Sequence, residues 1–133
     1  MIRISTRGRY GLRAMVQLAE AFETGPVLMR TIAAEQDISL KYLHAVLTTL
    51  KGAGLVRSVR GAHGGYSLAR PPSKITAKEV VQALEGSLAP VACVADGGLC
   101  ERAESCAVRN LWRDLGNAID STLSGVTLAD LMP

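Results

Sequence analysis

The only cysteines in the chain, Cys93, Cys100 and Cys106, lie within fourteen residues of one another. Gly97 and Gly98 lie between them, and glycine tolerates the positive φ angles that a tight loop needs, so the three thiols can converge on one point. Three soft sulfur donors in such a loop are typical of a metal site or an iron-sulfur cluster. We therefore predict that this segment is a sensor that controls the rest of the chain.

The composition is typical of a folded chain of ordinary domain size. The sequence has 133 residues, of which 48% are hydrophobic, and this is enough for a core. No apolar run approaches the roughly 20 residues of a membrane span, and the arginine-rich N-terminus lacks the apolar segment of a signal peptide. We expect a cytoplasmic protein that does not enter a membrane. In a reducing compartment, an odd number of cysteines argues against a disulfide framework and leaves free thiols or metal ligation.

Charge is distributed unevenly along the chain. The formal net charge is +3, but residues 1–78 carry twelve Lys or Arg against four Asp or Glu, whereas residues 79–133 carry three against eight. A basic N-terminal portion is typical of a polyanion binder, whose affinity falls as salt rises. Charge alone also allows a solvated basic face without a partner.

The apolar periodicity predicts three helices at 6–23, 29–36 and 40–51, with Ser39 as the N-cap of the third. The side of the third helix that we expect to be core consists of Leu40, Leu43, Val46, Leu47 and Leu50. The opposite side is centred on Lys41, Ala45 and Thr48. A short turn before such a helix predicts a helix-turn-helix whose second helix enters a DNA major groove.

Two short alternating segments after the third helix predict a β-hairpin wing. They span 55–59 and 66–68, and a flexible basic tip from Arg60 to Gly65 separates them. Arg60 is the natural probe of an adjacent minor groove, because a narrow groove attracts a guanidinium group. The alternative is an ordinary exposed hairpin whose arginine meets only water or phosphate.

The C-terminal part contains two capping-box signatures and one long amphipathic stretch. The signatures lie at 76–79 and 127–130, and residues 107–124 between them predict a long helix with an apolar stripe. Cys106 should lie just before this helix, where the helix dipole and free amides stabilise a thiolate. The stripe packs either on its own domain or on a second copy. We favour pairing, because a helix-turn-helix reader usually needs two half-sites.

These features together predict a mainly α protein in two parts. Residues 1–72 form a winged helix-turn-helix DNA-binding domain with a β-hairpin wing, and Pro71-Pro72 closes it. Residues 73–133 form the cysteine-containing sensor loop and the dimerisation helices, including the long C-terminal one.

Five motifs spread over the chain carry a resemblance to a known family. They are STRGRYG at 5–11, ISLKYL at 38–43, GLVRSVRG at 54–61 running into GGY at 64–66, the three cysteines, and LWRDL at 111–115. By these motifs, nearly the whole chain resembles the bacterial winged-helix regulators of the IscR, NsrR and CymR type.

The resemblance implies a homodimeric transcriptional repressor that binds partly palindromic, double-stranded operator DNA and is controlled by an iron-sulfur cluster. It implies a recognition helix in the major groove and the wing arginine in the minor groove. The residues implied for DNA contact are Arg7, Arg9, Ser39, Lys41, Tyr42, His44, Arg60, Gly64 and Gly65. Packing is the alternative for Tyr42, and simple exposure is the alternative for His44. Iron-sulfur regulators of this type carry Glu where His44 stands, so their operator preference does not transfer.

The resemblance also implies that Cys93, Cys100 and Cys106 hold a 2Fe-2S or 4Fe-4S cluster. The fourth cluster ligand of these relatives has no counterpart in this chain. Where the iron-sulfur regulators have a histidine ligand, this sequence has Arg109. The nitric-oxide sensor uses a carboxylate near its N-terminus, and the first acidic residue here is Glu20. Other candidates are a residue brought near by dimerisation, an exogenous ligand, or a carboxylate of the loop. The loop carboxylates are Asp96, Glu101 and Glu104.

Other functions of the cysteines stay open at this point. Zinc normally takes a fourth protein ligand in a closed site, but the only histidines, His44 and His63, lie in the predicted DNA-binding half. Unliganded thiols would make a redox-controlled regulator. A thiol oxidoreductase is disfavoured, because the chain has no Cys-x-x-Cys, no phosphate-binding glycine pattern and no cysteine paired with a histidine base. A winged helix that binds protein is the last alternative. We do not expect an enzyme.

Overall fold

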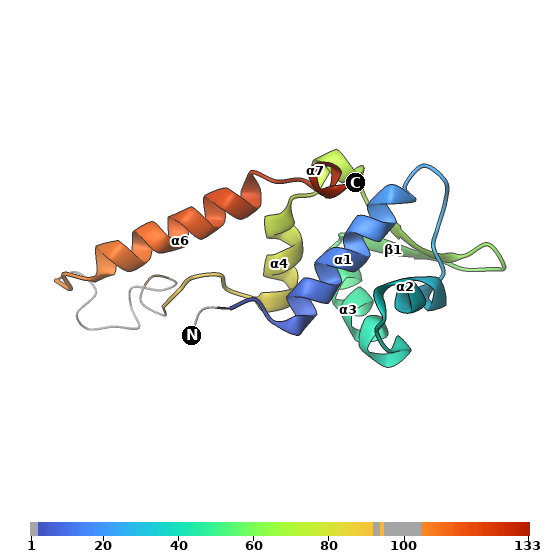
Figure 1. Ribbon diagram of the computed structural model, residues 1–133, viewed down its shortest axis with the longest axis horizontal. Helices are drawn as coiled ribbons and strands as arrows, with labels where there is room; N and C mark the ends of the chain where they lie inside the picture. The colour runs from blue at the N-terminus through green and yellow to red at the C-terminus, as the bar shows by residue number, and fades with distance from the viewer. Residues whose placement is uncertain (1–2, 92–93, 95–104) are drawn as a thin grey trace.

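The chain is mainly helical, with one β-hairpin, in a computed structural model that describes residues 3–91, 94 and 105–133 (Figure 1). The helices and strands are α1 (Thr6–Glu20), α2 (Met29–Gln36), α3 (Leu40–Gly52), β1 (Val56–Val59), β2 (Gly65–Leu68), the 3-10 helix η1 (Pro72–Lys74), α4 (Ala77–Glu85), α6 (Arg109–Ser124) and α7 (Leu128–Leu131). The predicted helix-turn-helix, wing and long helix are therefore present in the predicted order.

Side-chain caps begin three of the helices where the sequence predicts. The Ser39 hydroxyl accepts from the Tyr42 amide at 3.1 Å, and Thr76 and Thr127 each form a complete capping box with the acidic residue three positions on. Each cap satisfies amides that a helix start leaves without partners, and so fixes the first residue of the helix. The first helix ends earlier than predicted, at Glu20, and turns follow it.

One hydrophobic core joins the helix-turn-helix to α4 and α7. Fully buried Met15 and Leu47 belong to the same core cluster as Val80 of α4 and Leu128 of α7. The backbone holds α7 in place, because the Leu128 amide donates to the Ile75 carbonyl at 2.9 Å. The two ends of the chain thus share the core that supports the helix-turn-helix.

The prediction that Leu40 is a core residue is wrong. Its side chain is 49% exposed, whereas Leu43, Val46, Leu47 and Leu50 are buried as predicted. Leu40 is the first residue of α3 and lies one turn before Leu43, where this helix first meets the core. Helical periodicity places a residue on a face but does not show how far along the axis the core extends.

The wing is a two-stranded antiparallel hairpin in which Val56 pairs with Leu68 and Val59 with Gly65. The segment before α2 joins β2 through an isolated β-bridge, because Val27 and Tyr66 exchange backbone hydrogen bonds of 2.9 and 2.8 Å. Gly65 has φ +135, and a Cβ there would overlap the Val27 backbone. Only glycine suits this position without a backbone shift.

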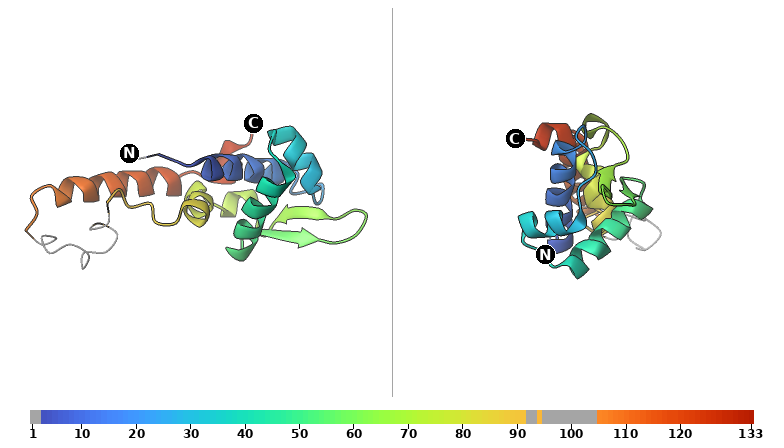
Figure 2. Two further views of the ribbon diagram at one scale, coloured as in Figure 1. Left: turned by 90° about the horizontal axis from the view of Figure 1, so that it is seen from below. Right: turned by 90° about the vertical axis from the view of Figure 1, so that its right-hand side faces the viewer.

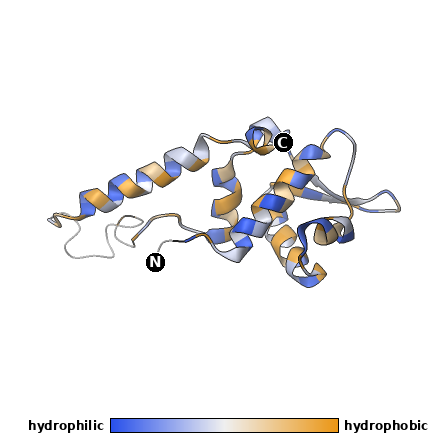
Figure 3. Cartoon of the chain, viewed as in Figure 1, coloured by the Kyte–Doolittle hydropathy of each residue, from blue (hydrophilic) through white to orange (hydrophobic). Residues whose placement is uncertain are grey.

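Helix α6 extends away from the helix-turn-helix, so that its far end and the wing lie at opposite ends of the molecule (Figures 1 and 2). None of its residues is buried, and Val108 beside it and Leu111 on it are 52% and 59% exposed. Hydrophobic (orange) and hydrophilic (blue) stretches are interspersed along the ribbon of this helix in Figure 3. An ion pair between Lys78 and Asp120 ties it to α4. In the part of the chain that the structure describes, no helix has the length and hydropathy to cross a membrane.

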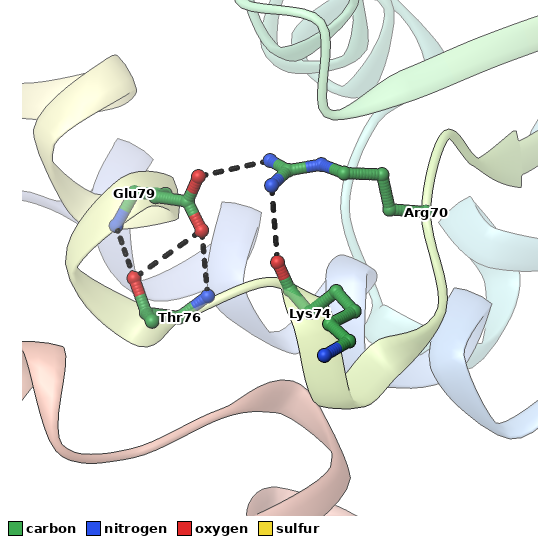
Figure 4. Close-up of polar contacts among 4 residues, drawn as sticks. All are labelled: Arg70, Lys74, Thr76 and Glu79. Carbon is green, nitrogen blue, oxygen red and sulfur yellow. Dashed lines mark hydrogen bonds and ion pairs between the residues drawn. The ribbon is translucent and has the colours of Figure 1, made fainter.

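Arg70, just after the wing, links the wing to the start of α4 (Figure 4). Its guanidinium donates to Glu79 Oε1 at 2.9 Å and to the Lys74 carbonyl at 3.0 Å, while Glu79 Oε2 accepts from the Thr76 amide at 2.9 Å. Partial burial acts to raise the pKa of Glu79, but the hydrogen bonds from the Thr76 backbone and from Arg70, and the charge of Arg70, together hold it below its ordinary value.

Candidate nucleic-acid interface

The outer face of α3 is exposed over its whole length. Lys41, His44, Ala45 and Thr48 all lie on the surface, and the opposite face is buried. The first two turns of the helix therefore present the ammonium group of Lys41, the imidazole of His44 and the small Ala45 to a partner. These groups can donate to base edges or phosphates while Ala45 permits close approach.

Two hydrogen bonds connect this face of α3 to its neighbours. From α1, Arg7 Nη2 donates to Thr49 Oγ1, and from α3 itself, Lys51 Nζ donates to Ser58 Oγ of β1 at 2.9 Å. Thr49 is held for this contact, because its own hydroxyl donates to the Ala45 carbonyl at 3.1 Å. The start of α1, the recognition helix and the wing thus form one continuous surface.

That surface is strongly basic. Its exposed cationic side chains include Arg7, Lys41 and Lys51, and Arg60 is exposed at the wing tip. The sequence places no acidic residue between Asp37 and Glu79, so nothing in α3 or the wing offsets this charge. A concentration of cations on one face, supplied by three elements, suits the phosphate backbone of a nucleic acid.

Lys51 of this surface was missed by the sequence analysis. It stands at the end of the predicted helix, away from the N-terminal turn and the wing tip where base readers are usually sought. Arg57 is also exposed, but the alternation of β1 puts it on the side opposite Val56 and Ser58, and Ser58 is the residue that Lys51 contacts.

Tyr42 and Ser39 have structural partners within the protein. The Tyr42 ring is half-buried, packs against the core and meets the Tyr10 ring edge to face, with the ring centroids 6.3 Å apart. The Arg13 guanidinium lies 5.2 Å from the centre of the Tyr10 ring. Ser39 is exposed and caps α3. Both residues therefore help to set the helix, and DNA contact by either stays a prediction.

The wing tip exposes Arg60 and His63 but not all of its backbone. Gly64 is buried, and its amide donates to the Gly61 carbonyl at 3.0 Å. Gly65 pairs with Val59 next to the tip and lies against the Val27 backbone. The phosphate contacts predicted for these two glycines are untested, and the Gly64 amide is already engaged within the tip.

Of the three cysteines, only Cys106 belongs to the described residues. Its thiol is free and half-buried, and it lies three positions before the first residue of α6, which confirms the predicted position. Cys93 and Cys100 lie outside the described residues, as do the candidate fourth ligands Asp96, Glu101 and Glu104.

The donor chemistry of the three cysteines suits a soft metal or a cluster. Thiolates bind zinc and iron-sulfur clusters in preference to hard cations such as Mg²⁺. Among the residues that can be described, no group of three His, Cys, Asp or Glu side chains comes together.

Comparison with known proteins finds similarity over almost the whole chain. A family model described as an iron-dependent transcriptional regulator, Rrf2, matches residues 4–133. The regulator CymR of Bacillus subtilis is 40% identical over 98% of this chain and 89% of its own length, and IscR of Klebsiella pneumoniae is 39% identical over 98% and 80%. The structure of B. subtilis CymR, described as the global cysteine regulator, is 40% identical with a TM-score of 0.82 and covers 98% of this chain and 96% of that one.

Proposed function

Because the chain belongs to the Rrf2 family of transcriptional regulators, we propose that it is a homodimeric, cytoplasmic repressor whose operator affinity is controlled at its three cysteines. It is a DNA-binding regulator with the winged-helix fold of CymR and IscR, and these relatives are regulators rather than enzymes. The basic surface that joins α1, α3 and the wing carries the proposal. In functional terms we assign DNA reading to residues 1–72 and sensing and pairing to residues 73–133, although α4 and α7 pack in the shared core.

For DNA reading, we propose that α3 enters the major groove and the wing follows the backbone into the adjacent minor groove. The residues assigned to contacts are Arg7, Arg9, Ser39, Lys41, Tyr42, His44, Arg60, Gly64 and Gly65. Exposed Lys41 and His44 would read base edges, and Arg60 would enter the minor groove. Arg7 and Arg9 would bind phosphate and fix the register.

The exposed apolar side of α6 supports a homodimer. Leu111 is more than half exposed in the single chain, and the helix has no buried residue. Burying such a stripe against a second copy removes apolar surface from water at about 25 cal/mol per Å². Two copies would present two recognition helices to the two halves of a partly palindromic operator.

For sensing, we propose that Cys93, Cys100 and Cys106 bind a 2Fe-2S or 4Fe-4S cluster. Such a group supplies a reversible response to iron, oxygen, nitric oxide or redox state when bound. Cys106 lies three residues before α6, so a group bound at Cys106 is close to the start of that helix. Since α6 is also the proposed dimer helix, a change at Cys106 can alter the distance between the two DNA-binding domains of the dimer.

The experiment combines metal analysis with DNA binding. Protein purified without oxygen is analysed for iron, sulfide and zinc, and operator duplexes selected from a random library are bound by loaded and stripped protein. We expect iron and sulfide in equal amounts and a difference in affinity or site preference between the two forms. Equal affinity and preference would refute control at the cysteines but leave the DNA reader intact.

A second candidate is a regulator controlled by its thiols without a cluster. The similarity to CymR favours this candidate, because the chain is as similar to CymR as it is to IscR, both in sequence identity and in the share of the chain that is matched. Oxidation or alkylation of the cysteines would then alter DNA affinity in protein that contains no iron. One zinc per chain, with no iron or sulfide, would point instead to a zinc-binding regulator.

A further inference from the structure

Glu85, the last residue of α4, contacts the start of α1 although eighty positions separate it from Ser5. The Ser5 amide donates to Glu85 Oε1 at 2.9 Å, and the Ser5 hydroxyl donates to the same oxygen. The hydroxyl oxygen of Ser5 in turn accepts from the Gly8 amide at 3.2 Å and caps α1. The carboxylate therefore holds the residue that fixes the first turn of α1.

The packing around this contact leaves little freedom. A Cβ on Gly8 would overlap the Glu85 carboxylate, and a Cβ on Gly11 would overlap the Leu84 side chain. The glycines of the first two turns of α1 thus allow the helix to sit directly on the end of α4. A negative carboxylate at this point also favours α1, because the start of a helix carries a partial positive charge.

The same turn of α1 supplies a side chain to the DNA-binding surface. Arg7 lies between Ser5 and Gly8 in the chain, and its guanidinium donates to Thr49 of α3. The position of the Arg7 guanidinium therefore depends on where α1 begins relative to α3. Glu85 holds that starting point through its two hydrogen bonds with Ser5.

We propose that Glu85 is a positioning residue for DNA binding, which holds the start of α1 so that Arg7 meets phosphate. This inference rests on the DNA surface proposed above. The inference predicts an unusual direction of change in DNA affinity. Removing a carboxylate from a polyanion-binding protein normally raises affinity, because repulsion of the phosphates falls. If Glu85 positions Arg7, its removal lowers affinity instead.

The test measures binding of a fluorescein-labelled duplex by anisotropy at several salt concentrations. We expect Glu85→Ala to bind about five-fold more weakly than the wild type and the slope of log K against log salt to fall by about 0.9, the value for a single phosphate neutralised by the protein. Glu85→Gln keeps an acceptor oxygen for Ser5 and should bind at least as well as the wild type. The double variant of Glu85→Ala with Arg7→Ala should bind no more weakly than Arg7→Ala alone.

A matched control lies at the other end of the same helix. Glu79→Ala also removes a hydrogen-bonded carboxylate from α4, but on the side of Arg70, so its DNA affinity should be unchanged or slightly higher. If Glu85→Ala cannot be obtained folded, Ser5→Ala removes the hydroxyl from the same contact and should weaken binding in the same direction.

Two results would overturn the inference in different ways. If Arg7→Ala weakens binding while Glu85→Ala binds as tightly as the wild type or tighter, the positioning role is wrong and the DNA surface stands. If Arg7→Ala has no effect on affinity or on the salt slope, Arg7 is not part of the DNA surface, and both proposals fail at this position.

Discussion

Replacing Gly65 by alanine should destabilise the protein more than the same exchange at Gly61, an open position of the wing. Gly65 has φ +135, and its added Cβ would overlap the carbonyl group of Val27. That carbonyl accepts from the Tyr66 amide at 2.8 Å, and the Val27 amide donates back at 2.9 Å. The substitution therefore strains one residue and pushes the Val27 segment away from β2.

The expected loss can be worked from these two effects. A non-glycine residue held in an unfavourable backbone region costs about 1–3 kcal/mol. Losing the two hydrogen bonds between Val27 and Tyr66 costs about 0.5–1.5 kcal/mol each. The total is about 2–6 kcal/mol, a large part of the 5–15 kcal/mol by which domains are usually stable.

Gly61 is the matched control, because it has φ +107 but a Cβ there would meet nothing within 4 Å. Gly61→Ala should cost only the backbone strain of about 1–3 kcal/mol. Urea unfolding followed by circular dichroism gives both free energies. The two variants should differ by about 1–3 kcal/mol, or about 4–12 °C in Tm. Equal destabilisation would show that the contact with Val27 does not hold the wing.

Three other changes test the stability network, the dimer and the DNA surface. Glu79→Gln should lower the free energy of unfolding by about 0.5–1 kcal/mol at neutral pH, the range for an exposed ion pair and a cap. Because the pKa of Glu79 is held below its ordinary value, this contribution is lost as the pH falls through that lowered pKa. The stabilities of variant and wild type should therefore converge in acid, and a constant difference at all pH values would refute the assignment. Leu111→Lys should shift the protein from dimer to monomer in sedimentation velocity while its circular dichroism is unchanged, and an unaltered dimer would exclude α6 as the contact. Lys51→Ala should reduce the slope of log K against log salt by about 0.9 if Lys51 neutralises one phosphate, and an unchanged slope would remove Lys51 from the DNA surface.

Local signals in the sequence were sufficient for most helix boundaries. Ser39 and the two capping boxes mark helix starts because a hydroxyl or carboxylate a few residues away satisfies the free amides. The alternation around Val56 located the wing for a similar reason, since neighbouring strand residues face opposite sides. These features depend on residues close in the chain, and so they are visible without the fold.

Other features depend on residues that are distant in the chain. The contact between Glu85 and Ser5 joins the end of one helix to the start of another, and no spacing rule relates positions eighty apart. The exposure of Leu40 was mispredicted because a helical wheel has no information on where the core ends. The burial of Leu128 likewise goes with a backbone pairing with Ile75, a residue distant in the chain.

The sequence by itself determined the order of the helices and the starts that a side chain caps, the basic character of the N-terminal part and the grouping of the three cysteines. Local hydrogen bonding, periodicity and charge are properties of neighbouring residues. Only the tertiary structure decided which cations share one surface, that α1 rests on the end of α4 through Gly8, and that Gly65 must leave room for Val27. These are matters of steric fit between surfaces, and they are settled only when the helices and the hairpin pack together.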